Sequence, residues 1–443
     1  MKKILLLISL SISSIAFGQI WNDLGENGIL SSNPPDLVSG LSIVLDSNNL
    51  PYAGFVEAGS NYQLNVKKLI GNTWTNVGSF INNNVIASNA SIALNSQNVP
   101  YVAYLEYDTS TSIHSGYVKK FDGTNWVVLG NLPFTVGVIG DLVLKIDGNN
   151  VPYVAYNTYQ NPDYIVVKKF NGTSWESLGS VTSQDSFHFD FDIDNTNIPY
   201  LVYDVVINLN VVVLAKKFNG STWINVGANA LVSNNGNSPS IAFDYNNIPN
   251  VAFESSPSLI VKKFNGTAWV NVGNVVSNNN ELKPKIAVGL NNIPVVCYQD
   301  ISNNGVVQVR KLNGSNWDMI STTATFEPME NYLAIAVGSN NNVYVAHDTQ
   351  NSVKAKFYGS NLDVKKNDID RALCIFPNPI EDYLNINLIE GIRKISILDL
   401  TGKTVHISDN GFSKINVSHL ESGFFIVKIA FDGFEIWQKF YKK

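Results

Sequence analysis

The chain has 443 residues and a formal net charge of −6, and only 15 % of its side chains are charged, whereas 11 % are aromatic. This mildly acidic balance, with no basic stripe, excludes a nucleic-acid-binding protein. The two cysteines, Cys297 and Cys374, fall in regions of different pattern. We therefore expect two free thiols and a fold that is held together by its hydrophobic core.

The N-terminus has the pattern of a secretory signal peptide. Lysines at positions 2 and 3 precede an apolar run over residues 4–17, which ends at the small residue Gly18. This run is too short for an ordinary transmembrane helix, and no other stretch approaches transmembrane length. The sequence predicts a signal peptide over residues 1–18 and a mature chain without a transmembrane segment.

A repeat of about 45 to 52 residues fills the middle of the chain. Tryptophan recurs, usually as Trp-x-x-Val/Leu-Gly, at Trp21, Trp74, Trp126, Trp175, Trp223, Trp269 and Trp317. An Asn-x-Pro pattern recurs at Pro51, Pro100, Pro152, Pro199, Pro249 and Pro294. Each copy contains four short runs of β-branched and aromatic residues, separated by turn residues such as Asn-Gly. Four strands per repeat of this length predict the blades of a β-propeller.

The number of strands predicts how the ring closes. Seven repeats contain the first three strands, but the seventh, over residues 333–357, has Leu362 where tryptophan is expected. The strand around Trp21 has no repeat before it. Because a closed ring leaves no exposed sheet edge, we predict an all-β, seven-bladed propeller over residues 19–360 whose N-terminal strand completes the last blade. A degenerate fourth strand around Leu362 is the alternative.

Another pattern begins at about Arg371. Phe376-Pro377-Asn378-Pro379 is followed by alternating apolar residues, and the later landmarks are Asp399, Gly402, Lys403, Gly423 and Lys428. In this order the motifs resemble the type A C-terminal sorting domain of type IX secretion substrates. The alternation by itself predicts a short-stranded β-sandwich over residues 371–443, and an ordinary Ig-like binding module is the alternative interpretation.

The resemblance implies a route of export. The C-terminal domain would be a small Ig-like sandwich that the type IX secretion machinery recognises. Cleavage would follow in the linker over residues 361–370, with release or attachment at the outer-membrane surface. We therefore expect a secreted, extracellular or surface-attached protein.

Departures from the repeat indicate where function lies, because residues present in nearly every blade serve blade packing. By this filter the tryptophans and the Lys-Lys pairs belong to the scaffold. The connections from the second to the third strand, and from one blade to the next, vary in length and must share one face of the ring. Variable loops on a rigid scaffold are where binding usually resides.

This variable face contains the candidate ligand-binding residues. The aromatic and histidine candidates are Tyr62, Tyr107, His114, Phe134, Tyr159, Tyr164, Phe187, His188, Phe326 and Tyr332. A broken acidic ring, with one side chain per blade near the end of the second strand, is predicted from Glu57, Glu106, Asn157, Asp204, Glu254, Asp300 and Asp348. Acidic groups beside aromatic rings suit sugar hydroxyls or a Ca²⁺ ion that bridges to a ligand. A solvated loop rim is the alternative interpretation.

The innermost strand contains a second group of candidates. Lys145 and Asp192 occupy a position that is alanine in other repeats, and Asp190 precedes Asp192 by two residues. The sequence predicts an ion pair between Lys145 and Asp192, with a metal or ligand site at the two aspartates in the channel as the alternative.

No motif in the sequence specifies a reaction. The five histidines lack metal-ligand spacing, and no Gly-x-Ser-x-Gly motif marks a nucleophile. We therefore predict a monomeric binding or adhesion protein for a glycan or a surface protein, with no catalytic residue assigned. A carbohydrate-active hydrolase or lyase that uses two carboxylates is the first alternative. A structural surface protein without a specific ligand is the second.

Overall fold

A computed structural model describes residues 20–31, 38–57, 62–79, 86–130, 132–159, 164–182, 186–227, 230–232, 235–278, 281–322, 325–359, 375–386, 392–408, 412–430 and 435–443. The predicted signal peptide (1–18), the predicted linker (361–370) and Cys374 lie outside these residues. The chain divides into two compact units, residues 1–360 and residues 361–443.

The first unit consists of antiparallel sheets that repeat one order of four strands. The first strands of the sheets are β3 (Val38–Leu45), β7 (Ile86–Leu94), β12 (Ile139–Ile146), β16 (Phe189–Ile193), β20 (Gly236–Phe243), β24 (Leu282–Val288) and β28 (Leu333–Val337). The second strands are β4 (Pro51–Glu57), β8 (Pro100–Asp108), β13 (Pro152–Thr158), β17 (Pro199–Ile207), β21 (Pro249–Ser255), β25 (Pro294–Asp300) and β29 (Val343–Thr349).

The outer half of each sheet contains the third and fourth strands. The third strands are β5 (Gln63–Ile70), β9 (Ile113–Phe121), β14 (Tyr164–Phe170), β18 (Asn210–Phe218), β22 (Ser258–Phe264), β26 (Val306–Asn313) and β30 (Ser352–Gly359). The fourth strands are β6 (Thr73–Asn76), β10 (Trp126–Val128), β15 (Trp175–Ser180), β19 (Trp223–Asn225), β23 (Trp269–Asn271), β27 (Asn316–Met319) and β1 (Ile20–Asp23). The additional elements are β2 (Ile29–Ser31), β11 (Thr135–Gly137) and the 3-10 helices η1 (Glu26–Gly28) and η2 (Ile301–Asn303).

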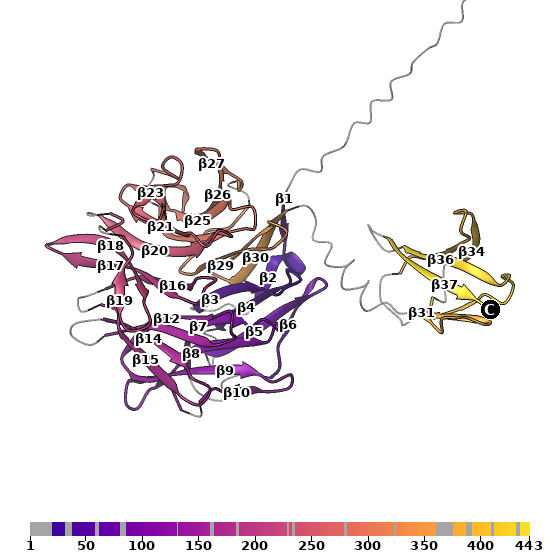
Figure 1. Ribbon diagram of the computed structural model, residues 1–443, viewed down its shortest axis with the longest axis horizontal. Coiled ribbons are helices and arrows are strands. Elements are labelled where there is room, and N and C mark those ends of the chain that lie inside the picture. Colours follow the sequence, from indigo (N-terminus) through magenta and orange to yellow (C-terminus); the bar gives the residue numbers. More distant parts are fainter. Residues whose placement is uncertain are drawn as a thin grey trace, which may run out of the picture. The chain divides into compact units, whose positions relative to one another are not determined.

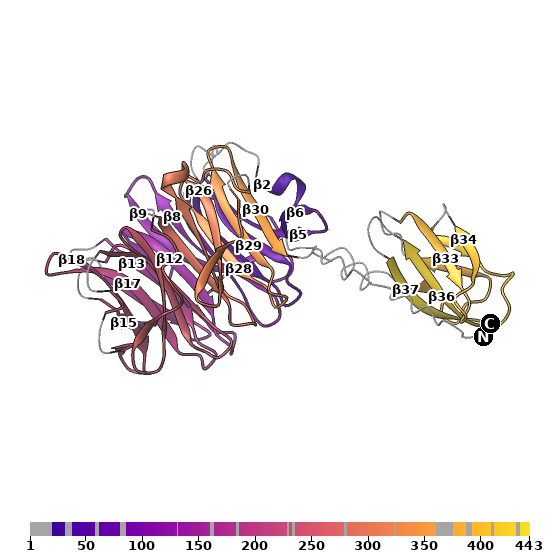
Figure 2. The same ribbon diagram turned by 90° about the horizontal axis from the view of Figure 1, so that it is seen from above.

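These sheets form a closed ring around an axis. The first strands contact one another in the cycle β3, β7, β12, β16, β20, β24, β28 and back to β3. The labels of β3, β7, β12 and β16 lie near the centre of this unit in Figure 1, and Figure 2 shows the same sheets from above. The last sheet closes through the N-terminal strand, since β1 pairs with β30 and Trp21 lies opposite Tyr358. The sequence-based prediction that the strand around Trp21 completes the last blade is therefore confirmed.

Asparagine side chains join each blade to the next at the turn between the first and second strands. The asparagine of each Asn-x-Pro pattern has a left-handed backbone, with φ between 58° and 68°, and its equivalent Asn341 has φ 60°. Its Oδ1 accepts a hydrogen bond from a backbone N–H in the same turn of the preceding blade. The donor and acceptor residues are Ser47 and Asn98, Ser96 and Asn150, Gly148 and Asn197, Asn195 and Asn247, Tyr245 and Asn292, Asn291 and Asn341, and Ser339 and Asn49.

The repeated tryptophans form a second set of bonds between blades, near the outer strands. Each indole Nε1–H donates to a backbone carbonyl of the preceding blade, as Trp223 does to Leu178 at 3.1 Å. The other donors are Trp21, Trp74, Trp126, Trp175, Trp269 and Trp317. The lysine pairs are split between two roles, since Lys216 donates to the Val181 carbonyl whereas Lys217 lies over the Tyr200 ring. Both patterns therefore belong to the scaffold.

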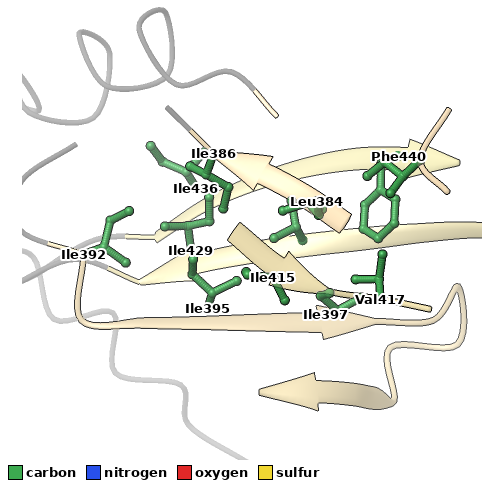
Figure 3. Close-up of a cluster of buried hydrophobic side chains, with 12 residues drawn as sticks. Leu384, Ile386, Ile392, Ile395, Ile397, Ile415, Val417, Ile429, Ile436 and Phe440 are labelled. Atoms are coloured by element: carbon green, nitrogen blue, oxygen red, sulfur yellow. The ribbon is translucent and has the colours of Figure 1, made fainter. Parts of the chain in front are cut away.

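The second unit is a small β-sandwich. One sheet contains β31 (Ile375–Phe376), β32 (Tyr383–Ile386) and β35 (Lys414–Asn416), and the other has the order β34 (Thr404–Ser408), β33 (Lys394–Leu398), β36 (Gly423–Ala430) and β37 (Glu435–Lys442). Alternate side chains of both sheets meet in one apolar core, in which Leu384 and Ile415 face Ile397, Val427 and Phe440. Figure 3 shows this cluster between the strands.

The motif residues of the second unit hold its turns in place. Asn378, between Pro377 and Pro379, accepts a hydrogen bond from the Tyr441 N–H and so ties the first turn to the last strand. Asp399 accepts bonds from the backbone N–H groups of Thr401 and Lys403, around Gly402 at φ 86°. Gly423 begins β36, and Lys428 pairs with Glu435 at 2.7 Å. These residues form turns and strand pairs of the sandwich.

The asparagine bonds between blades predict a graded loss of stability. Asn197→Gly removes one bond but tolerates φ 68°, so we expect it to lower the free energy of unfolding by about 1 kcal/mol. Asn197→Ala removes the same bond but keeps a Cβ in the left-handed region without the polar side chain that lets asparagine tolerate it, so it should cost about 1–2 kcal/mol more than Asn197→Gly. Urea unfolding followed by tryptophan fluorescence measures both variants. Equal free energies of unfolding for the two variants would contradict a strained backbone at this position. An unchanged free energy of unfolding in Asn197→Gly would contradict a stabilising role of the hydrogen bond to Gly148.

Candidate functional site

A pocket of about 510 Å³ lies at the end of the ring axis where the first strands begin. Every blade contributes to its wall, through the start of its first strand or the residue before that strand. One position per blade lies eleven residues before the first residue of the second strand, as His188 does before Pro199. At this position the seven blades have Gly40, Asn89, Asp141, His188, Ser238, Lys283 and Tyr332, all of which line the pocket. We call this set the axial ring.

Irregular strand pairing accompanies the axial ring in five of the seven blades. The register between the first and second strands shifts in five blades, for instance between Ser39 and Leu41 and between Leu282 and Lys285. The bulged residues Gly40, Asn89, Ser238 and Lys283 have φ between 47° and 73°. A bulge of this kind changes the direction of a side chain without ending the strand. In these blades the bulge presents a different side chain each time, whereas His188 and Tyr332 lie directly before first strands whose pairing is regular.

Buried carboxylates at the fifth residue after the start of the second strand support this wall. Asp204 is fully buried and accepts hydrogen bonds from the backbone N–H groups of Phe187, His188 and Ser238. Asp348 is 2 % exposed and accepts from the N–H groups of Asn331 and Tyr332. Both carboxylates thus hold the backbone of the axial ring in place.

The two further side chains at this position are also buried, and one of them, Glu254, lines the pocket as well. Glu254 is 5 % exposed and accepts a bond from the Lys283 N–H of the next blade, and burial raises the pKa of its carboxyl group. Asn157 is 1 % exposed, and neither of its amide atoms has a hydrogen-bond partner among the described residues.

The other three acidic candidates lie one residue later along the second strand, and they are not brought together with the first set. Glu106 accepts a hydrogen bond from Tyr104, and Asp300 accepts one from Ser302. Glu57 lines a separate pocket of about 480 Å³ together with Lys67. Successive residues of a strand point to opposite faces, so the seven side chains cannot form the single acidic ring that the sequence analysis describes.

The aromatic candidates are also divided. Tyr107 packs on His114 with ring centroids 4.8 Å apart. Tyr159 is 54 % exposed, whereas Tyr164, at the start of β14, is partly buried. Phe134 and Phe326 are 2 % and 4 % exposed and belong to the core, so their expected place on the variable face is corrected. Of this group, His188 and Tyr332 line the axial pocket.

The channel candidates lie deeper along the first strands. Lys145 and Asp192, from adjacent blades, form an ion pair at 3.1 Å. Asp190 turns to the blade on the other side and accepts a hydrogen bond from Ser240 at 2.8 Å. Within the part of the chain that the structure describes, no cluster of three or more His, Cys, Asp or Glu side chains could hold a metal ion.

His188 and Asp204 form a closely coupled pair. The Nδ1 atom of His188 lies 2.8 Å from Oδ2 of Asp204, whose side chain is fully buried, while the imidazole is 49 % exposed. The hydrogen bond to Asp204 raises the pKa of His188, and the charges of Asp141 and Glu254 act in the same direction. The pocket therefore contains an imidazole of increased basicity whose orientation is set by a carboxylate.

Five residues of the axial ring were missed by the sequence analysis, namely Gly40, Asn89, Asp141, Ser238 and Lys283. The signal was present, because all lie at the same distance before the Asn-x-Pro landmark. Comparing copies at that distance would have identified a position that is polar or small in six blades and aromatic in one.

Comparison with known proteins identifies the second unit. Residues 374–443 match the family described as the secretion system C-terminal sorting domain. No curated protein matches the chain. Among the described residues, no helix has the length and apolar character needed to cross a membrane.

Solved structures resemble this chain at low sequence identity. An ulvan lyase of a new polysaccharide lyase family, bound to -[GlcA(1-4)Rha3S]-, is 14 % identical with a TM-score of 0.50, and the match covers 76 % of this chain and 98 % of that chain. The SapL1 lectin in complex with alpha methyl fucoside is 12 % identical, with 66 % and 97 % covered and a TM-score of 0.43. The β-propeller domain of the Trilobed protease from Pyrococcus furiosus is 7 % identical, with 73 % and 97 % covered and a TM-score of 0.46.

The fold and the family match together define the class of protein. The chain is an exported all-β protein, secreted or held at the cell surface, in which a β-propeller precedes a type IX secretion sorting domain. The predicted all-β class, a propeller followed by a small β-sandwich, and the predicted localisation are thereby confirmed.

The pair in the axial pocket makes a testable electrostatic prediction. Asp204→Asn removes the charge that raises the pKa of His188, so we expect its NMR titration midpoint to move to lower pH. Because the folded-state pKa is raised, the pair stabilises the fold below the unfolded value of about 6.5, and this contribution is lost as the pH rises through the folded value. The matched control is Asp348→Asn, which changes an equivalent carboxylate that holds no histidine. A midpoint unchanged in Asp204→Asn, or shifted equally by both variants, would contradict the pairing.

We expect export of the protein to require a folded sorting domain. We expect deletion of residues 371–443 to prevent appearance of the protein at the cell surface or in the medium. Val427→Asp should have the same effect, because it places a carboxylate in a fully buried position of the sandwich. Ile407→Ser, on a side chain that is 50 % exposed, is the control and should leave export unchanged. Fractionation of producing cells measures all three, and export of the deleted chain would refute the assignment.

Proposed function

We propose that this protein is an exported glycan-binding protein whose ligand binds in the axial pocket. The observation that carries the proposal is the axial ring: at a single position of an otherwise repetitive scaffold, seven blades present seven different residues to one cavity. Scaffold positions repeat because every blade needs them, so a position that differs in every blade is free for ligand recognition.

The size and chemistry of the pocket favour a sugar over a protein surface. A cavity of about 510 Å³ lies within the range of small-ligand pockets, which is roughly 300–1,000 Å³. Hydrogen-bond donors and acceptors from Asn89, Asp141, His188, Ser238 and Lys283 surround it, and Tyr332 with Phe189 supplies an apolar wall. Sugar rings combine hydroxyl groups with apolar faces and so match this mixture. Exposure outside the cell would give the pocket access to glycans of other cells or of the surroundings, consistent with a role in adhesion.

Binding to a glycan array, with calcium and again with a chelator, tests the proposal on the mature chain. We expect selective binding, with an affinity that falls about tenfold or more in His188→Ala and in Asp141→Ala, because each variant removes a hydrogen bond that involves a charged side chain. Glu106→Gln is the matched control and should bind normally, because this carboxylate lies outside the pocket. Loss of binding in the presence of the chelator would show that the ligand binds together with Ca²⁺. Selective binding that survives both pocket variants, or no binding in either condition, would refute the proposal and favour a protein ligand or a structural role.

A further inference from the structure

The pairing of His188 with Asp204 leaves one ring nitrogen available to a ligand. Nδ1 donates its proton to a carboxylate that three backbone N–H groups also hold, so the imidazole is fixed in orientation and tautomer. Nε2 then has its lone pair, and the half-exposed ring lines the axial pocket. This is the arrangement in which a histidine serves as a general base.

Comparison of blades shows that the pair is a departure from the scaffold. Asp348 occupies the equivalent position in the last blade and holds the same two backbone N–H groups, but Tyr332 replaces the histidine. Holding the backbone therefore requires only the carboxylate. Among the described residues, His188 is the one imidazole of the axial ring, and packing of the blade does not explain it.

Positive charge lies in the same pocket. Lys283 and Lys285, both on β24, line its wall, and neither forms an ion pair with a described carboxylate. Lys283 donates to the Asn331 carbonyl and keeps further N–H groups for a ligand. An anionic group of a bound sugar would find its countercharge at these two lysines.

The carboxylates of the pocket do not suit hydrolysis by a pair of acids. Such a reaction needs two carboxyl groups that both reach the substrate. Asp204 and Asp348 are buried and saturated with backbone bonds, and Glu254 is 5 % exposed and accepts the Lys283 N–H. Glu254 also lines the pocket, but its two oxygens accept hydrogen bonds from the Lys283 N–H and the Asn237 amide, so Asp141 is the one exposed carboxylate among the described acidic residues of the pocket. A reaction that needs one base and a cation fits these residues better.

We propose that the axial pocket cleaves uronic-acid polysaccharides by β-elimination, with His188 as the catalytic base and Asp204 as its positioning residue. This inference rests on the proposed function, because the same pocket must first bind the glycan. Nε2 removes the proton from C5 of the uronate, the C5 electron pair forms the C4=C5 double bond, and the C4–O bond to the leaving sugar breaks. Water protonates the leaving oxygen, and His188 returns its proton to solvent. Lys283 and Lys285 stabilise the negative charge that builds on the uronate carboxylate as C5 loses its proton.

The electrostatics of the site set the expected pH dependence. Asp204, Asp141 and Glu254 all favour the protonated imidazole, so their charges raise the pKa of His188. The base form is present above that pKa, and the rate should rise with pH through it. Asp204→Asn should move this rise of the rate to lower pH, because it removes a charge that raises the pKa of His188. It should also reduce the maximum rate, because the imidazole loses its fixed tautomer.

Ultraviolet absorbance of the unsaturated product tests the proposal on the mature chain. The substrates are polygalacturonate, alginate and a glucuronate-containing polysaccharide, with a neutral glucan as the control, and binding of each polymer is measured in parallel. We expect absorbance to grow with at least one acidic polymer, and His188→Gln to lower the rate at least about 100-fold, as general-base catalysis implies. Lys285→Gln should weaken cleavage of the acidic polymer, and Glu106→Gln should leave it unchanged.

The outcomes separate this proposal from the proposed function. Binding of an acidic polymer without any new double bond would overturn elimination while leaving glycan binding intact. Cleavage that persists in His188→Gln would overturn the assignment of the base. Binding to neutral glycans alone would overturn the acidic substrate class, and absence of binding to any glycan would overturn both proposals.

Discussion

The hydrogen bonds between adjacent blades are the interaction on which the rest of the first unit depends. Each junction combines an asparagine side chain at the turn after the first strand with an indole N–H at the fourth strand, as in Asn247 and Trp269. The final junction joins residues almost three hundred positions apart, since Trp21 donates to Ile320 and Asn49 accepts from Ser339. Because the bonds run around the whole ring, the scaffold is complete only when the N-terminal strand pairs with β30.

Closure of the ring creates the candidate site. The seven first strands lie far apart along the chain but surround one axis. A single position of the repeat therefore becomes a ring of side chains. The scaffold bonds lie elsewhere in each blade, and the axial position is therefore free to vary. Buried carboxylates such as Asp204 and Asp348 make this variation compatible with a rigid backbone, since they satisfy the N–H groups at the start of the first strand whatever side chain follows.

The alternation of side chains along a strand explains where the prediction of the site failed. Glu57, Glu106 and Asp300 appear next to Asp204 and Asp348 when repeats are aligned loosely, but they lie one residue further from the start of the second strand. A shift of one residue moves a side chain to the opposite face of a sheet. The loose alignment thus merged carboxylates that support the backbone with carboxylates that face a different environment, whereas the exposed Asp141 lay on another strand.

By itself the sequence determined the all-β class, the four-strand repeat, the closing N-terminal strand and the sorting domain, because these depend on local patterns: period-two alternation, turn residues such as Asn197, and an ordered set of motifs from Pro377 to Lys428. The tertiary structure alone decided which polar side chains share a cavity. His188 pairs with Asp204 across the first two strands of one blade, and Lys283 reaches the same pocket from another blade, at a bulge in its first strand. The curvature of the closed ring decides which of these side chains meet in one cavity. No local pattern of residues specifies that curvature.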